Sequence, residues 1–134
     1  MAYTEGEPPY VLDSARVHFY AILDDSVTYT GRITTYVGGR LLGPVPRLAI
    51  CENLAEDNDF LILYCNDAWE VLGAGGSETL DGALFSAERA YRGLKEKWQS
   101  LPPLNARQLA YVETVKNFVR SEQPSGAYPE PPNA

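Results

Sequence analysis

The sequence predicts an α+β fold, with an antiparallel sheet of about five strands over residues 16–73 packed by helices over residues 78–98 and 105–121. Three patterns support this prediction. Apolar and polar residues alternate over residues 27–37, which is typical of a half-buried strand. Residues 60–65 are apolar on both parities, as expected of a strand covered on both faces. In the second half of the chain, apolar residues recur at spacings of three and four, which indicates helices lying on a core.

The first two strands are expected to form a hairpin. Residues 16–23 (RVHFYAIL) are rich in β-branched and aromatic types, and the turn sequence DDS joins them to residues 27–37. The glycine pair at residues 38–39 permits positive φ and therefore a second reversal. Because the two prolines within residues 44–46 cannot donate ladder hydrogen bonds, regular pairing is expected to resume near Arg47.

Residues 60–65 (FLILYC) form the expected central strand. The dipeptide ND then turns the chain into a short strand, AWEVLG at residues 68–73, in which Trp69 and Val71 share a face. Since this strand leads directly into the first helix, Trp69 is expected to pack beneath that helix.

The first helix is expected to begin at Ser77, a favourable N-cap residue, with Glu78 and Asp81 near its positive end. A glycine inside a helix costs about 1 kcal/mol relative to alanine, so Gly93 is expected to interrupt the helix near Arg92. The apolar stripe continues past the interruption. It consists of Leu80, Leu84, Ala87, Tyr91, Leu94 and Trp98.

After the breaker LPPL, Asn105 and Gln108 resemble a capping box that opens the last helix. The apolar side of this helix is expected to comprise Leu109, Val112, Val115 and Val119. Residues 1–122 are predicted to form a single domain, as is usual for a chain of 134 residues. The proline-rich residues 123–134 are predicted to form a flexible tail, and residues 1–9 are expected to lie outside the core.

The stretch VLGAGGSETL at residues 71–80 has the order of parts of a phosphate-binding turn. Gly73 and Gly75 match the dinucleotide fingerprint G-x-G-x-x-G, but Glu78 stands at the third glycine position. The fingerprint also requires a parallel strand after the helix, and no strand-like run follows Ser77. A nucleotide site is therefore not expected, and GAGGS is interpreted as a flexible connection from strand to helix.

Acidic residues dominate the first half of the chain. The net charge is −7, and residues 1–67 carry ten acids against four bases. Residues 51–70 contain no lysine or arginine, and such a surface repels nucleic acid while attracting basic proteins. The acids of this stretch are Glu52, Glu56, Asp57, Asp59, Asp67 and Glu70. Together with Tyr36, an amphipathic ring on the polar parity of its strand, they are the candidate partner-binding residues. Solvation of the loops is their alternative role.

Few residues could carry chemistry. His18 is the only histidine and lies in a predicted strand, where packing or surface exposure is its ordinary role. Cys51 and Cys65 are the only cysteines, and their spacing does not supply a zinc site, so no metal or cofactor is expected and both thiols are expected to be free. The alternative is a small-molecule-binding domain or small enzyme, with a pocket between sheet and helix near His18 and Cys65.

No run approaches the roughly 18 to 20 apolar residues that cross a bilayer, and the opening MAYTEGEPPY lacks the order of a secretory signal. A cytoplasmic protein that contacts neither membrane nor nucleic acid is therefore expected. A homodimer, formed through an exposed strand edge or the last helix, is a further alternative.

Three stretches, RLAICEN, LYCNDAWEVLGAGGSET and AERAYRGLKEKW, resemble a set of small bacterial proteins with a strand pair ending in C-x-x-x-W and a helix ending in A-E-x-x-Y-x-G-x-x-x-K-W. The resemblance covers residues 47–98. Some of these proteins resemble immunity proteins, which neutralise a toxin delivered between bacteria. The resemblance implies a compact intracellular binder with no reaction of its own. The shared residues, mostly packing types that indicate a common fold, are Cys65, Trp69, Glu88, Tyr91, Gly93 and Trp98.

Overall fold

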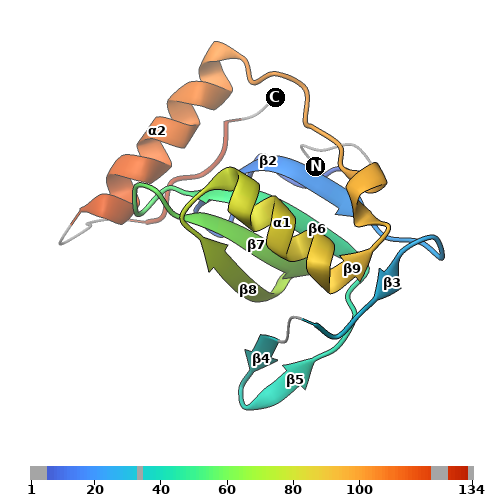
Figure 1. Cartoon of the computed structure of the whole chain (residues 1–134). Coiled ribbons are helices and arrows are strands. Elements are labelled where there is room, and N and C mark those ends of the chain that lie inside the picture. The colour runs from blue at the N-terminus through green and yellow to red at the C-terminus, as the bar shows by residue number, and fades with distance from the viewer. Residues whose placement is uncertain (1–5, 33–34, 122–126, 133–134) are drawn as a thin grey trace.

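The computed structural model describes residues 6–32, 35–121 and 127–132. A five-stranded antiparallel sheet curls through the centre of the molecule, and one helix lies across one of its faces (Figure 1). Its strands, in their spatial order, are β1 (Val11–Leu12), β2 (Ala15–Ile22), β6 (Arg47–Asn53), β7 (Phe60–Cys65) and β8 (Val71–Ser77). The predicted α+β class and the five-stranded antiparallel sheet are confirmed.

The prediction that residues 16–23 and 27–37 form a hairpin is wrong, because β2 pairs with β6 and not with residues 27–37. All apolar positions of β6 from Leu48 to Cys51 are buried, so β6 can occupy the interior of the sheet, where both faces are covered. Residues 27–37 are polar on one parity and cannot do so. Gly31 adopts a φ of 72° and breaks this run. Ile33 and Thr34, which belonged to the expected alternation, lie outside the described residues.

The broken run instead supplies two short strands. The first, β3 (Thr28–Tyr29), pairs with β9 (Tyr91–Arg92), and the second, β4 (Thr35–Val37), forms a hairpin with β5 (Arg40–Leu42). The reversal at the glycine pair is confirmed, with φ values of 59° and 82° at Gly38 and Gly39. The β4–β5 hairpin projects from the molecule as an arm, and its strand β4 contacts β8 at the edge of the sheet (Figure 1).

Apolar side chains cover both faces of β7, as predicted. Ile62 and Tyr64 face the core beneath helix α1 (Leu80–Ala90), while Leu63 and Cys65 belong to the core on the opposite face. In the order of the strands, however, β6 is central and β7 is the next strand toward the β8 edge. The sheet is therefore buried on both faces although a helix covers only one of them.

The glycine-rich segment is not a flexible connection. Residues 71–77 form the edge strand β8, with Gly75 opposite Ile62 and Ala74 opposite Leu63. A Cβ at Gly75 would lie 3.8 Å from the Tyr64 hydroxyl oxygen, an ordinary van der Waals contact, so sterics alone do not require glycine at this position. Because β8 is antiparallel to its neighbour, the segment also lacks the parallel topology of a dinucleotide site.

Trp69 precedes β8 in a tight turn and does not pack beneath α1. Its ring lies in the core on the opposite face, where it shares the cluster that contains Val71, as predicted for that pair. The backbone of Trp69 is in the left-handed region with a φ of 61°, and its ring packs edge-on to Tyr20 of the opposite-face cluster at a centroid distance of 5.8 Å.

The N-cap of helix α1 lies two residues later than expected, at Thr79 and not at Ser77. The Thr79 hydroxyl accepts a 3.0 Å hydrogen bond from the Gly82 amide. The helix ends at Ala90. After β9, Gly93 adopts a φ of 89° and leads into a 3-10 helix at Leu94–Lys97. The predicted interruption is thus confirmed, and all six residues of the apolar stripe lie in or against the core beneath α1.

Helix α2 (Ala106–Arg120) carries the predicted capping box. The Asn105 side chain accepts from the Gln108 amide at 2.8 Å, and the Gln108 side chain accepts from the Asn105 amide at 2.9 Å. Val112 and Val115 are buried, but Leu109 is 43% exposed and does not belong to the buried side. The helix lies beside the turn between β6 and β7 (Figure 1). Its buried residues pack against Leu54, and together they form a third core cluster.

Both ends of the described chain contact the domain. Pro8 is fully buried, so the expectation that residues 1–9 lie outside the core is wrong at this position. Within the predicted tail, the Tyr128 ring lies edge-on against Phe118, and the Tyr111 hydroxyl donates a 3.1 Å hydrogen bond to the Pro129 carbonyl. The mobility of this segment stays a prediction. Within the described residues, the longest helices are too short and too polar to span a bilayer.

Candidate interaction surfaces

The six candidate acids fall into two groups at opposite ends of β7. Glu52, Glu56, Asp57 and Asp59 lie at or near the turn between β6 and β7, whereas Asp67 and Glu70 lie in the turn between β7 and β8. The six residues of β7 separate the two turns by about 20 Å at the usual strand rise. The acids that are neighbours in sequence therefore do not form one continuous surface.

Basic residues from α2 neutralise part of the first group. Arg120 Nη2 lies 2.9 Å from an Asp57 carboxylate oxygen, and its Nε donates a 2.8 Å hydrogen bond to the Leu54 carbonyl. The hydrogen bond from Arg120 Nη2 to the Asp57 carboxylate and the Arg120 charge, with a smaller effect of Lys116, lower the pKa of Asp57. Residues 51–70 themselves contain no lysine or arginine. The cations near Asp57 come from α2, about sixty residues further along the chain.

Two other acids of the first group also have internal partners. Glu52 lies 3.1 Å from His18 Nε2, and an Asp59 carboxylate oxygen accepts a 2.7 Å hydrogen bond from the Asn53 side chain. Both carboxylates are half-buried, whereas Glu56 is exposed to solvent. This turn is thus acidic but partly occupied by interactions within the domain.

The second group lies in a turn that is held by Asn66. The Asn66 side-chain oxygen accepts hydrogen bonds of 2.9 Å from the amides of Ala68 and Glu70, and its nitrogen donates a 2.7 Å hydrogen bond to the Glu70 carboxylate. Asp67 and Glu70 are both exposed. The turn therefore presents two carboxylates on a backbone that is fixed by hydrogen bonds.

The β4–β5 hairpin presents three apolar side chains to solvent, and we call them the hairpin surface. Tyr36 is 66% exposed, Leu41 is 54% exposed and Val37 is 46% exposed. The parity of the sequence identified Tyr36 but placed Val37 on the buried side and gave no signal for Leu41. Strand β4 also contacts β8, whose Leu72 is 39% exposed. The hairpin surface is therefore next to the strand that follows the acidic turn of Asp67 and Glu70.

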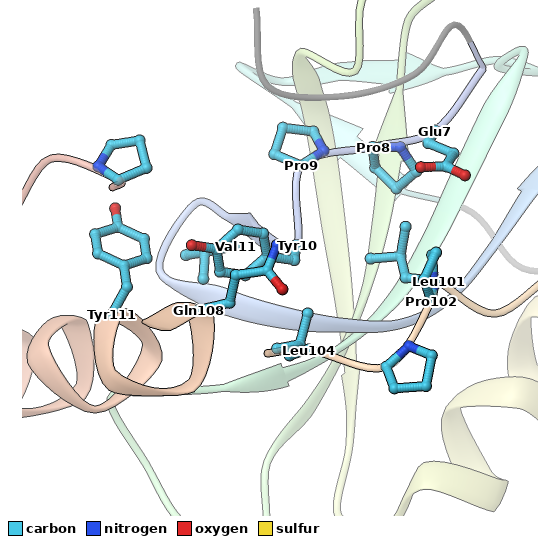
Figure 2. Close-up of a pocket in the computed structure, with 12 residues that line it drawn as sticks. Glu7, Pro8, Pro9, Tyr10, Val11, Leu101, Pro102, Leu104, Gln108 and Tyr111 are labelled. Atoms are coloured by element: carbon cyan, nitrogen blue, oxygen red, sulfur yellow. The ribbon is translucent and has the colours of Figure 1, made fainter. Parts of the chain in front are cut away.

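A second candidate site is a groove between the N-terminal segment and α2, shown in Figure 2. It contains an apolar pocket of about 300 Å³ and an adjoining polar hollow of about 470 Å³, and Val11 and Tyr111 line both. We call the two together the α2 groove. Its walls come from the N-terminus, residues 101–104, α2 and the tail, so local sequence patterns gave no signal for it.

His18 and Cys65, the residues of the alternative site, line neither of these hollows. Cys65 is fully buried, and burial raises the pKa of its thiol to about 12. Burial also raises the pKa of Cys51 well above its usual value. Both cysteines are free, and they lie on different rungs of the ladder, since Cys51 is opposite Leu61 while Cys65 is opposite Arg47.

No protein-family model matches the sequence, and no curated protein or solved structure that was compared with it matches either.

Proposed function

We propose that this chain is a non-enzymatic protein-binding domain that works in the cytoplasm and neutralises a basic partner protein, in the manner of an immunity-type inhibitor. The observation that carries the proposal is the hairpin surface. Tyr36 and Leu41 are cross-strand partners and share one face of the exposed hairpin, while Val37 lies on its other face. Neighbouring apolar side chains that are exposed in this way are typical of protein interaction sites. Tyr36, the most exposed of them, is also of a residue type that is enriched among the dominant contacts of interfaces.

We propose a basic partner because acidic side chains lie near the hairpin surface. Asp67 and Glu70 lie in the turn that leads into β8, which β4 contacts. Carboxylates at the rim of an interface attract a basic partner and increase the rate of association, while the buried apolar contacts determine how slowly it dissociates. The partner we propose therefore has an apolar hollow that accepts Tyr36, surrounded by lysine or arginine.

The immunity-type role is supported by the resemblance of residues 47–98 to a set of small bacterial proteins, some of which resemble immunity proteins. Neutralisation by binding requires no reacting groups, and the two thiols are buried and protonated at neutral pH. Two free cysteines also agree with a reducing compartment. These features favour binding over catalysis.

Replacing Tyr36 with alanine is expected to weaken partner binding by roughly tenfold or more, because a buried interface tyrosine contributes about 2 kcal/mol. Tagged wild-type protein is used to capture the partner from the native cell, and the dissociation constant of the purified pair is measured by calorimetry. Leu109→Ser is the matched control, because Leu109 is an exposed apolar residue on α2, away from the hairpin. Equal capture by wild type and Tyr36→Ala would contradict the proposal.

Reversing the charge of Asp67 to lysine is expected to slow association several-fold at low salt, and the effect should fade at high salt because exposed charges are screened. Glu56→Lys tests the other acidic turn, where the sequence analysis also placed partner contacts. Association rates are measured by surface plasmon resonance at two salt concentrations. If neither reversal changes the rate, the acidic residues have no part in partner binding.

A further inference from the structure

The two hollows of the α2 groove share Val11 and Tyr111, and mainly apolar side chains line the first of them. Tyr10 and Tyr111 meet edge to face with their ring centroids 5.9 Å apart, and Leu101, Leu104 and Pro9 line the pocket beside them (Figure 2). Grooves with tyrosine walls are suited to extended proline-rich segments, because such segments are already ordered before binding and present flat rings.

One carboxylate lines each hollow of the groove. Among the residues that the structure describes, Glu7 is the only charged residue that lines the apolar pocket, and Asp13 is the only charged residue that lines the adjoining hollow. Asp13 is exposed, and the turn that contains it holds a φ of 49°. An extended segment lying across both hollows would meet one negative charge in each of them.

The chain itself already places proline-rich backbone on this surface. The segment YPEPP at residues 128–132 runs past α2, where the Tyr111 hydroxyl donates to the Pro129 carbonyl and Pro131 lines the apolar pocket. The Tyr128 hydroxyl shares a 2.8 Å hydrogen bond with the Ser14 hydroxyl at the polar hollow. The tail forms one wall and leaves both hollows open.

We propose that the α2 groove binds an extended, proline-containing segment of a partner protein that carries a basic residue at each end. The apolar rings of the segment lie against Tyr10 and Tyr111, and its basic side chains pair with Glu7 and Asp13. The inference rests on the proposed function only in that the ligand belongs to a protein. It uses a different face, since the groove and the hairpin surface share no residue.

The test uses a fluorescein-labelled peptide with the sequence Arg-Pro-Pro-Leu-Pro-Arg and the full-length chain. Saturable binding is expected in fluorescence anisotropy, and a peptide with glutamate at both ends should bind at least tenfold more weakly. Glu7→Gln and Asp13→Asn should each weaken binding roughly fivefold, which corresponds to a partly exposed ion pair. Asparagine tolerates the positive φ of position 13. Asp67→Asn is the control and should have no effect.

Amide signals in nuclear magnetic resonance spectra locate the bound peptide. Shifts are expected at Val11, Leu104 and Gln108, and not at Tyr36. The absence of saturable binding, equal binding of the acidic peptide, or a homodimer that Glu7→Gln disrupts would each overturn the proposal. Tyr36→Ala separates the two proposals, because it should weaken partner capture and leave peptide binding unchanged. If the partner is captured but the peptide does not bind, only the proposal about the α2 groove is overturned. If the peptide binds but no partner is captured, only the proposed function is overturned.

Discussion

Replacing Trp69 with alanine is expected to lower the free energy of unfolding by about 3–5 kcal/mol, the usual range for removing a large aromatic side chain from a core. Trp69 is only 3% exposed. Its ring lies edge-on to Tyr20 at a centroid distance of 5.8 Å, and the Arg47 guanidinium lies 5.3 Å from the centroid of the ring. The loss therefore removes both buried area and two specific contacts.

The cavity left by this substitution is expected to persist. Trp69 covers the sheet face that no helix covers, where Cys65 and Leu63 of the rigid β7 are its neighbours. Strands that are hydrogen-bonded on both sides cannot move inward to fill the space, and the cost of a cavity rises when its surroundings do not relax. The turn that is held by Asn66 also keeps the backbone in place.

Urea unfolding followed by circular dichroism measures this effect. Phe85→Ala is the control, because Phe85 is 62% exposed on α1 and should change stability by less than about 0.5 kcal/mol. Trp69→Phe should retain most of the stability, since the indole nitrogen of Trp69 is buried without a hydrogen-bond partner among the described residues. A loss below about 1.5 kcal/mol for Trp69→Ala would show that Trp69 does not hold this face of the sheet.

Replacing Gly93 with alanine is expected to destabilise the fold by about 2–4 kcal/mol, from a strained backbone and a steric overlap together. Gly93 adopts a φ of 89°, which disfavours any side chain. A Cβ at this position would lie 2.6 Å from the Ser26 carbonyl oxygen, and backbone cannot move as a flexible side chain would. Segment 26–30 would have to shift away from β9.

The shift would also disturb the end of α1. The Thr30 amide donates a 2.9 Å hydrogen bond to the Ala90 carbonyl, and the Thr30 hydroxyl donates a 2.7 Å hydrogen bond to the Arg89 carbonyl. These bonds occupy carbonyl groups that have no partner within a helix. Displacing residues 26–30 therefore exposes the last turn of α1 as well as breaking the β3–β9 pair.

Gly39→Ala is the matched control for Gly93→Ala. Gly39 has a similar φ of 82°, but a Cβ there would have no neighbour within 4 Å. It should show only the backbone cost of about 1–2 kcal/mol, so the difference between the two variants reports the overlap with Ser26. If the two variants lose equal stability in thermal unfolding, residues 26–30 move away from the added methyl group without an energetic cost.

Local patterns predicted the elements whose structure is local. The capping box at Asn105 and Gln108 forms as expected because both of its hydrogen bonds lie within four residues. The apolar stripe of α1 and the interruption at Gly93 also formed, since helical periodicity depends only on neighbouring residues. The two-sided burial of β7 follows from its unbroken apolar run.

Pairing partners were not predictable in the same way. Residues 27–37 have the alternation of a strand, but alternation does not reveal which strand lies alongside, and the interior position beside β2 went to β6. The glycines of β8 resembled a connection because glycine is rare in strands. Their place opposite Ile62 and Tyr64 depends on which strand lies alongside, and the local sequence does not specify that strand.

By itself, the sequence determined the class of the fold, the helix that carries the capping box, and the acidic and aromatic residues that are available for a partner. The tertiary structure alone decided that the six acids divide between two turns, that Arg120 neutralises Asp57, and that four separate segments enclose the α2 groove. The physical reason is that propensity and periodicity act within a few residues, whereas charge pairing and cavities depend on which distant segments the core brings together.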